Sequence, residues 1–352
     1  MSATFFGSIS CALPSTTHDR VVLGHGSGGK LSASLVREHF LPHLHSHALH
    51  LLGDGAVVSA GHTKVVLSTD TFVVNPLEFP GGDIGDLAVN GTVNDLAMMG
   101  ALPCYLTAGF IIEEGLSMEL LDRVVASMAR AAGVAGVQIV AGDTKVVEHG
   151  KGDGLFINTT GLGLANSEFR PAPNRARAGD AILVSGPIGV HGITILSTRE
   201  GLGFEADLAS DTACLYPLVQ LLRRAVRDEV SALRDPTRGG VASTLNEIAA
   251  ASDVGIEIEE SELPIPVAVA GACEMLGLDP LYVANEGIFV AFVPAHRAEQ
   301  ALEAMRAHPL GANARRIGRV VDDHPGLVVM RTGLGGTRVV DMLPGDQLPR
   351  IC

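Results

Sequence analysis

Residues 83–100 read DIGDLAVNGTVNDLAMMG, and this stretch decides the expected fold. Its polar positions recur at spacings of three and four residues, so they form one stripe along an α-helix. The stripe consists of Asp83, Asp86, Asn90 and Asn94. Most other positions are apolar, which predicts a buried helix. Asp95 points about 100 degrees away from Asn94 around the helix axis, so it faces a different partner and is a candidate metal ligand.

Strand-like and helix-like segments alternate on both sides of this helix. Ser117 is a candidate N-cap for a second helix, which is expected to end near Gly133. The strand-like segments are residues 64–74, 105–112, 138–141 and 155–161. The alternation predicts one α/β domain over residues 21–165.

The composition changes between residues 165 and 179, where Pro171 and Pro173 prevent regular structure. We expect the domain junction there, followed by a second α/β domain over residues 175–342. Its expected strands are residues 181–185, 255–259, 287–293 and 326–330, and its expected helices are residues 212–230, 267–276 and 295–306.

Both ends of the chain lack a periodic pattern. Residues 1–20 are predicted to form a flexible arm. Residues 343–352 read LPGDQLPRIC, with two prolines and a glycine, and are predicted to form a mobile tail that ends in Cys352. An extended tail of this length spans about 33 Å.

The overall composition excludes several classes of protein. The 25 Lys and Arg residues against 39 Asp and Glu residues give a net charge of −14, which repels a nucleic-acid backbone. Glycine and proline interrupt every apolar run before the ~20 residues that span a bilayer, and the N-terminus lacks a signal-peptide pattern. The five cysteines include no CxxC pair, so neither a disulfide framework nor a thiolate zinc site is expected. A cytoplasmic protein is therefore expected.

Residues 24–30 read GHGSGGK and satisfy the pattern GxxxxGK. Leu31 stands where a P-loop needs the hydroxyl of Ser or Thr on Mg²⁺, so a true P-loop is disfavoured. We expect a loop that closes over a ligand, with Lys30 as a mobile cation; a simple tight turn is the alternative.

Five histidines fall within residues 39–50. A metal site would require a helix that begins at Pro42 and brings His43, His47 and His50 onto one face. A solvated segment is the favoured interpretation.

Five aspartates lie where strands end or helices begin: Asp54, Asp70, Asp95, Asp143 and Asp235. The carboxyl ends of strands are where α/β sheets bind ligands, and converging carboxylates repel one another unless cations lie between them. Their placement indicates a site for a nucleotide with Mg²⁺. The alternative is that each aspartate merely caps a helix or a turn.

Several segments together resemble the HypE family of hydrogenase maturation factors. They are GHGSGGK at 24–30, STDTFVVNPLEFPGGDIGDLAVNGTVNDLAMMGA at 68–101, AGDTKVV at 141–147, DPTRGGV at 235–241 and PRIC at 349–352. The aspartate motifs are shared with aminoimidazole ribonucleotide synthetase, thiamine monophosphate kinase and selenophosphate synthetase, whereas the terminal PRIC is specific to HypE. Selenophosphate synthetases normally carry cysteine or selenocysteine in the glycine-rich loop, and this chain has none there.

The resemblance implies a two-domain α/β fold like that of aminoimidazole ribonucleotide synthetase. It implies a homodimer formed through the sheet of the first domain, with ATP and Mg²⁺ bound near that interface. The implied carboxylate ligands of Mg-ATP are Asp54, Asp70, Asp95 and Asp235. Asp143, Asn94 and Lys30 are further expected cofactor-binding residues.

The resemblance also implies the chemistry. A carbamoyl group would arrive on the thiol of Cys352 from the carbamoyltransferase HypF, and ATP would drive its dehydration to a thiocyanate. The cyanide would pass to iron held by HypC and HypD. Family resemblance points to Glu286 as the base and to Lys145 as either a second base or a cation that steers phosphate. Incidental thiols are expected at Cys11, Cys104, Cys214 and Cys273.

Two other functions use the same aspartates. Another ATP-dependent kinase or ligase of the superfamily would have no use for Cys352. A scaffold without catalysis would bind nucleotide and partner proteins but would leave the nucleotide intact.

Overall fold

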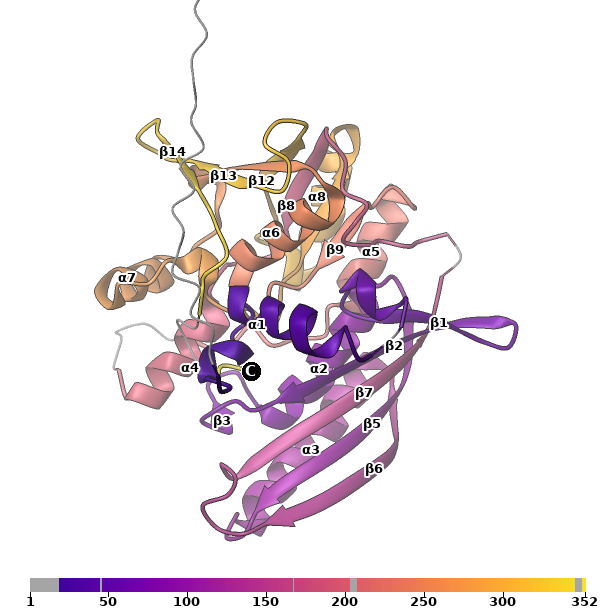
Figure 1. The fold of residues 1–352 in the computed structure, drawn as a ribbon, viewed down its shortest axis with the longest axis vertical. Coiled ribbons are helices and arrows are strands. Elements are labelled where there is room, and N and C mark those ends of the chain that lie inside the picture. The colour runs from indigo at the N-terminus through magenta and orange to yellow at the C-terminus, as the bar shows by residue number, and fades with distance from the viewer. Residues whose placement is uncertain (1–18, 45, 167, 203–207, 346–349) are drawn as a thin grey trace, which may run out of the picture.

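The computed structural model describes residues 19–44, 46–166, 168–202, 208–345 and 350–352. Within them, two large sheets organise the chain (Figure 1). The first has the strand order β1-β2-β7-β5-β6, and the second has the order β14-β13-β10-β12-β8-β11-β9. A small hairpin of β3 (Glu78–Phe79) and β4 (Gly82–Asp83) leads into the helix α2.

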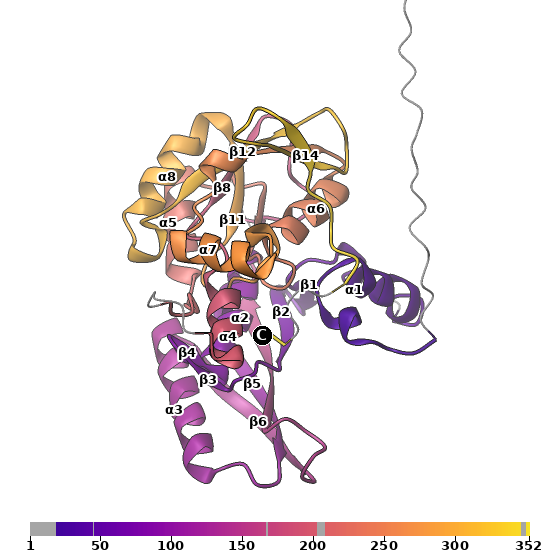
Figure 2. The same ribbon diagram turned by 90° about the vertical axis from the view of Figure 1, so that its left-hand side faces the viewer.

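The first sheet is antiparallel except for the parallel pair β5 and β6. Its strands are β1 (Ala56–Ala60), β2 (Thr63–Phe72), β5 (Leu102–Glu113), β6 (Gln138–Val147) and β7 (Leu155–Leu164). The helices α2 (Ile84–Met98) and α3 (Met118–Ala135) cover one face (Figure 2). This inner face therefore forms the core of the N-terminal half.

The helix α2 is almost entirely buried, as the sequence predicts. Asp83 caps it, because its Oδ1 accepts hydrogen bonds from the amides of Gly85 at 2.8 Å and Asp86 at 3.0 Å. A Cβ atom on Gly91 would lie 2.9 Å from the ring of Phe72, so a glycine at this position lets α2 approach the sheet closely.

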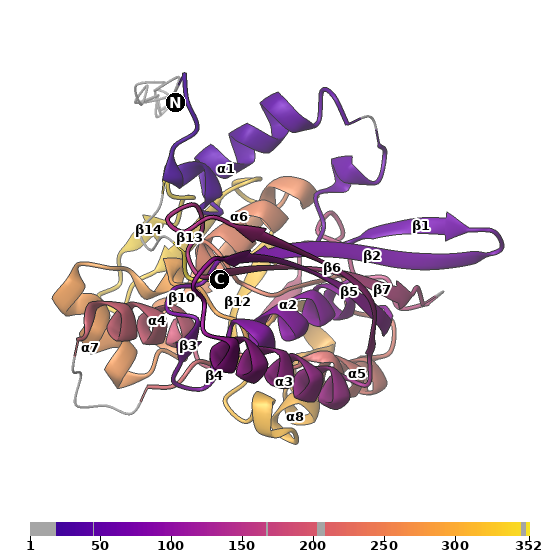
Figure 3. The same ribbon diagram turned by 90° about the horizontal axis from the view of Figure 1, so that it is seen from below.

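The opposite, outer face of the first sheet is not covered by α2 and α3. The segment that contains α1 (Lys30–Leu35) lies on that side (Figure 3). Large apolar side chains nevertheless remain exposed on the outer face: Leu67, Tyr105, Ile111 and Leu164. Exposed apolar residues that gather on one sheet face are typical of an interaction surface.

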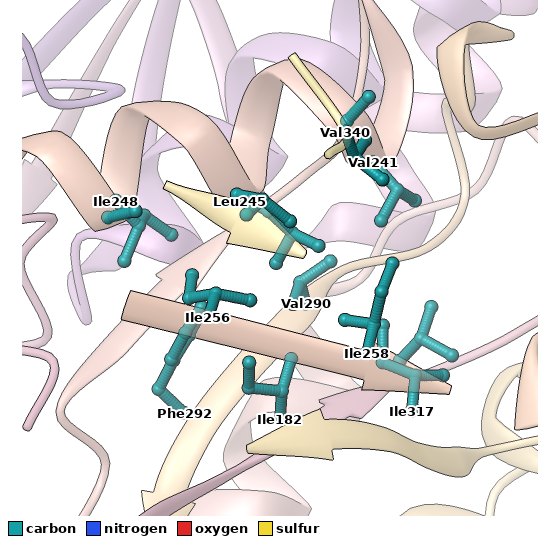
Figure 4. Close-up of a cluster of buried hydrophobic side chains, with 14 of the residues drawn as sticks. Ile182, Val241, Leu245, Ile248, Ile256, Ile258, Val290, Phe292, Ile317 and Val340 are labelled. Carbon is teal, nitrogen blue, oxygen red and sulfur yellow. The ribbon is translucent and has the colours of Figure 1, made fainter. Parts of the chain in front are cut away.

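The second sheet lies between two layers of helices. Its strands are β8 (Asp180–Val184), β9 (Ala232–Arg234), β10 (Gly255–Glu259), β11 (Val290–Pro294), β12 (Arg315–Val321), β13 (Val328–Arg331) and β14 (Thr337–Val339). The helix α6 (Gly240–Ser252) packs on one face through Leu245 and Ile248 (Figure 4). The helices α5 (Tyr216–Val226) and α8 (Ala298–Arg306) pack on the other face. Because both faces are covered, every residue of β8 is buried.

Two further helices lie outside these layers. They are α4 (Val190–Glu200) and α7 (Val267–Leu276), and they pack against each other through Ile193 and Val269. The observed bounds of α7 and β10 coincide with the expected ones. No described helix is both long and apolar enough to cross a membrane.

The structure differs from the expectations about several elements, among them two helices and one strand. The helix expected over 212–230 begins only at Tyr216, because Asn94 binds the backbone of the preceding loop, with its Oδ1 accepting from the amide of Leu215 at 2.8 Å. The helix α3 continues past Gly133 to Ala135. The strand expected over 138–141 extends to Val147, because it pairs with β5 along its length.

The predicted flexible arm falls mostly on residues 1–18, outside the described residues. The described parts of the predicted mobile tail contact the body of the protein. The carbonyl of Leu343 accepts a hydrogen bond from the amide of Lys30 at 2.8 Å, and residues 350–352 lie beside residues 73–75. The mobility of the tail stays a prediction.

Replacing Asn94 with Ala should lower the free energy of unfolding by about 2–4 kcal/mol, because it leaves buried backbone groups without partners. The Nδ2 of Asn94 donates to the carbonyls of Ala213 at 3.0 Å and Glu286 at 3.3 Å, in addition to the bond with Leu215. Urea unfolding measures the change. Asn90→Ala is the control, because Asn90 bonds the side chains of Asp86 and Thr212 instead. Equal losses in both variants would contradict this account.

Candidate functional site

Three carboxylates from separate segments converge between the two halves of the chain. Asp54 precedes β1, Asp95 lies in α2 and Asp235 follows β9. One oxygen of each lies within 4.8 Å of the others, and we call this group the acidic cluster. Within the described residues, it is the one group of three or more His, Cys, Asp or Glu residues close enough to hold a metal ion.

Burial makes the negative charge of the acidic cluster costly. The pKa of Asp54 is raised to about 8 and the pKa of Asp235 to about 6, and desolvation is the largest cause of both shifts. The pKa of Asp95 also rises well above its usual range, through burial and then through repulsion from Asp235 and Asp54. A bound cation or a proton is needed to relieve this repulsion.

Asp95 and Asp70 reach this region from neighbouring elements. The Oδ2 of Asp95 accepts a hydrogen bond from the hydroxyl of Ser68 at 2.5 Å, whereas Asn94 binds backbone. This confirms that Asp95 and Asn94 face different partners. Asp70 lies two residues after Ser68 in β2. Burial raises the pKa of Asp70, and the positive charge of Arg238 partly offsets that rise.

Two arginines near the acidic cluster were not predicted from the sequence. The Nε of Arg234 lies 2.7 Å from Asp54, and its Nη2 lies 2.8 Å from Glu247. Arg238 interacts electrostatically with Cys352, Asp70 and other acidic groups of the site. Arg234 directly precedes the motif DPTRGG and Arg238 lies within it, but nothing in the spacing showed that both turn toward the same site.

A cavity of about 290 Å³ lies between the glycine-rich loop and the end of β2. We call it the Cys352 pocket, and its lining includes Ser27, Val73, Arg238, Ser243 and Cys352. The Nη1 of Arg238 donates to the carbonyl of Gly26 at 3.1 Å, which holds the loop against the pocket. The loop therefore lines the pocket, and its closure over a ligand stays a prediction.

The conformation of the loop depends on Gly28. Its φ is +77°, and a Cβ atom there would lie 2.6 Å from the carbonyl oxygen of Arg238. A larger residue would force the loop away from the pocket. Lys30 begins α1 and its ammonium pairs with Asp341 at 2.5 Å, so in this structure it is engaged by the segment that precedes the predicted tail.

The thiol of Cys352 and the carboxyl of Glu286 are neighbours. Glu286 is only 3% exposed, and its Oε1 has no hydrogen-bond partner among the described residues. Burial raises the pKa of Glu286 strongly, and the charges of Asp235 and Asp70 raise it further. Burial also raises the pKa of the Cys352 thiol; Arg238 opposes the shift, and a hydrogen bond with Glu286 adds to it. The carboxyl of Glu286 therefore lies beside the thiol of Cys352 with one oxygen free to accept a hydrogen bond or a proton, although its raised pKa favours the protonated form in the metal-free site.

Two predicted site residues lie elsewhere in the single chain. Asp143 and Lys145 are exposed on β6, where they form an ion pair of 2.7 Å with each other. They pair in register with Gly109 and Ile111 on the outer face, whereas the acidic cluster lies on the inner side with α2. The structure therefore does not bring them to the other predicted residues within one chain.

The histidine-rich segment does not form the helix that a metal site would require. Residues 36–40 form one short helical turn and residues 49–51 form another, so no helix begins at Pro42. This geometry leaves His43, His47 and His50 without a common helical face.

Replacing Asp95 with Asn should stabilise the metal-free protein at pH 8 by about 1 kcal/mol or more. The pKa of Asp95 is raised on folding, so its ionisation weakens the folded state as the pH rises. The gain should shrink as the pH falls toward 4, because the carboxyl of the unfolded chain then begins to take up a proton as well. Denaturant unfolding at both pH values measures it.

Asp143→Asn is the control for this prediction. Hydrogen bonding with Lys145 lowers the pKa of Asp143, so neutralising it should give no gain at pH 8. A loss of stability in Asp95→Asn at pH 8 would contradict the repulsion argued for the acidic cluster.

Comparisons with known proteins agree with this geometry. The families described as AIR synthase related protein, N-terminal domain and C-terminal domain, match residues 52–165 and 177–330. Carbamoyl dehydratase HypE of Azotobacter vinelandii is 55% identical over 332 residues, covering 94% of this chain and 97% of that protein. Carbamoyl dehydratase HypE of Escherichia coli K12 is 47% identical, covering 95% of this chain and all of that protein.

Solved structures show the same relationship. The hydrogenase maturation protein HypE in complex with ATP has a TM-score of 0.80 at 50% identity and covers 95% of this chain and 100% of that one. The HypE-HypF complex has a TM-score of 0.84 at 46% identity and covers 88% of this chain and 100% of that one. AaThiL, solved with AMPPCP and TMP, has a TM-score of 0.68 at 21% identity, covers 90% of this chain and 96% of that one, and supports the fold alone. The chain therefore belongs to the HypE family of carbamoyl dehydratases, within the AIR synthase related proteins.

Proposed function

We propose that the chain uses ATP to dehydrate a carbamoyl group on the thiol of its own Cys352, giving a thiocyanate for cyanide ligation of [NiFe]-hydrogenase iron. The observation that carries this proposal is the position of Cys352 in a pocket beside Glu286 and the glycine-rich loop. Relatives at 47–55% identity are named carbamoyl dehydratases, and one relative was solved with ATP.

The acidic cluster suits a magnesium ion. Carboxylate oxygens are the ligands that Mg²⁺ prefers, and three of them lie within 4.8 Å of one another with raised pKa values. Asp54, Asp95 and Asp235 would hold the ion, and Asp70 would add a fourth carboxylate. When bound, Mg-ATP supplies the phosphoryl group that makes the carbamoyl oxygen a good leaving group.

The residues of the Cys352 pocket supply the other requirements. The thiol of Cys352 carries the substrate, and its position fixes the carbamoyl group beside Glu286. The carbamoyl nitrogen would lose one proton to solvent when its oxygen takes the phosphoryl group. Glu286 would accept the second proton as the carbon–oxygen bond breaks, phosphate leaves and the carbon–nitrogen triple bond forms. Arg238 places positive charge where negative charge develops.

The electrostatics of Glu286 link the base to the acidic cluster. Asp235 and Asp70 are among the groups that raise its pKa. Balancing their charge lowers the pKa of Glu286 toward the range in which it is ionised and accepts a proton. We therefore expect Glu286 to become an active base only in the charge-balanced site.

A homodimer through the outer face forms part of the proposal. Leu67, Tyr105 and Ile111 are each more than a third exposed there in the single chain. A second copy packed on this face would cover them and would place Asp143 and Lys145 at the interface. Whether Lys145 then acts as a base or steers phosphate depends on its distance from the substrate.

The proposed reaction needs a donor for the carbamoyl group and an acceptor for the cyanide. We propose HypF as the donor of the carbamoyl group, since a HypE relative was solved with it, and a HypC-HypD complex as the acceptor of cyanide. We place the reaction in the cytoplasm, as expected from the sequence.

The proposal predicts two successive mass changes at Cys352. Incubation with the partner transferase, carbamoyl phosphate and ATP should add one carbamoyl group to the chain, and dehydration should then remove one water. Intact-mass and peptide mass spectrometry measure both steps. Cys352→Ser should show neither change, whereas Cys104→Ser, which alters a partly exposed thiol elsewhere, should behave like the wild type. Normal modification of Cys352→Ser would refute the carrier role.

A second prediction separates the base from the carrier. Glu286→Gln should slow dehydration about 10²–10⁴-fold while leaving carbamoylation of Cys352 intact, because only the proton acceptor is removed. The carbamoylated chain should then accumulate, as intact mass shows. Glu262→Gln, at a short turn after β10, is the control. Dehydration at the wild-type rate in Glu286→Gln would exclude Glu286 as the base.

A further inference from the structure

The last three residues present three backbone acceptors to the protein. The amide of Val73 donates to the terminal carboxylate of Cys352 at 3.2 Å, and the amide of Asn75 donates to the carbonyl of Arg350 at 3.4 Å. The carbonyl of Ile351 lies between these two acceptors in the sequence and takes a different donor.

That donor is the imidazole of His191, on α4. Its Nε2 lies 3.0 Å from the carbonyl oxygen of Ile351, and its Nδ1 lies 2.7 Å from the hydroxyl of Ser210. Burial lowers the pKa of His191 to about 4, so the ring is neutral at pH 7. Because the carbonyl can only accept, Nε2 carries the proton and Nδ1 accepts from Ser210.

The surroundings of this contact exclude water. His191 is fully buried, Ile351 is 3% exposed, and the ring of Phe79 lies edge-on to the imidazole at 5.7 Å. The side chain of Ile351 belongs to a hydrophobic cluster that includes Phe79 and Ala284. A carbonyl buried in such a place is costly when it lacks a donor.

The loop that supports His191 also supports Glu286. The hydroxyl of Ser210 accepts a hydrogen bond from the amide of Thr212 at 3.1 Å. Asp211 lies between these two residues in the sequence, and its Oδ1 accepts a hydrogen bond from the amide of Glu286 at 3.1 Å. The loop of residues 210–212 therefore fixes two groups. It orients the imidazole of His191, which bonds the tail, and it holds the backbone of Glu286, whose carboxyl lies beside the thiol of Cys352.

We propose that His191 is a positioning residue that holds the carbonyl of Ile351 and thereby places the thiol of Cys352 beside Glu286. This inference rests on the proposed function, in which Cys352 carries the substrate. His191 does not touch the reacting atoms. It acts by keeping the tail docked.

The test measures how quickly a bulky polyethylene-glycol maleimide modifies Cys352 in the full-length, nucleotide-free protein. Peptide mass spectrometry assigns the modified thiol. His191→Ala should raise the rate about tenfold, because docking then leaves a buried carbonyl without a donor. His191→Gln should restore slow modification, since its amide N–H can reach the same carbonyl.

Thr194→Val is the matched control on the same helix. Thr194 is buried, and its hydroxyl donates within α4 to the carbonyl of Val190 at 2.8 Å. Cys352 in Thr194→Val should therefore be modified at the wild-type rate. If His191→Ala does not fold, Ser210→Ala replaces it, because it removes the group that fixes the ring. That variant should also raise the rate.

Two results would overturn the proposal. One is an unchanged rate in a folded variant that lacks the imidazole or its Ser210 partner. The other is modification of His191→Gln as fast as that of His191→Ala, which would show that the ring acts only by packing. Failure of the proposed function is distinguishable, because the wild type incubated with the transferase, carbamoyl phosphate and ATP would then show neither the carbamoyl gain nor the loss of water at Cys352, whatever the rate of its maleimide modification.

Discussion

The burial of three carboxylates in one small volume is the constraint on which the rest of the site depends. Asp54, Asp95 and Asp235 come from segments far apart in the sequence, and both halves of the chain must dock to bring them together. Arg234 balances only part of their charge, because it also pairs with Glu247. The folded chain therefore holds stored repulsion that a cation relieves, which links the stability of the protein to occupation of its site.

The C-terminal tail completes this site with an element of the same chain. Its final residues lie beside residues 73–75, just after β2, and the thiol of Cys352 lines the pocket with the glycine-rich loop and Arg238 and lies beside Glu286. A substrate attached to the tail needs no binding energy of its own, since docking of the backbone positions it. Presenting the thiol to a partner would require the tail to leave this position, which stays a prediction.

Local patterns predicted much of the fold, and distant contacts account for what they missed. The polar stripe of residues 83–94 correctly indicated a buried helix, and Asp95 correctly faced away from it. The helix expected from Thr212 starts late because Asn94, more than a hundred residues earlier, binds that backbone. His191 and Arg238 escaped prediction because their contacts with the tail come from tertiary packing. Asp143 was predicted from its place near a strand end and from the motif resemblance, and Lys145 from the resemblance alone; the single chain instead pairs them with each other on the outer face of β6.

The most direct test is a crystal structure of the full-length protein with Mn²⁺ and a non-hydrolysable ATP analogue, in which anomalous scattering locates the metal. The account predicts Mn²⁺ between Asp54, Asp95 and Asp235, with the thiol of Cys352 facing the terminal phosphate beside Glu286. A metal bound elsewhere, or a thiol that stays outside the pocket in the presence of nucleotide, would contradict it.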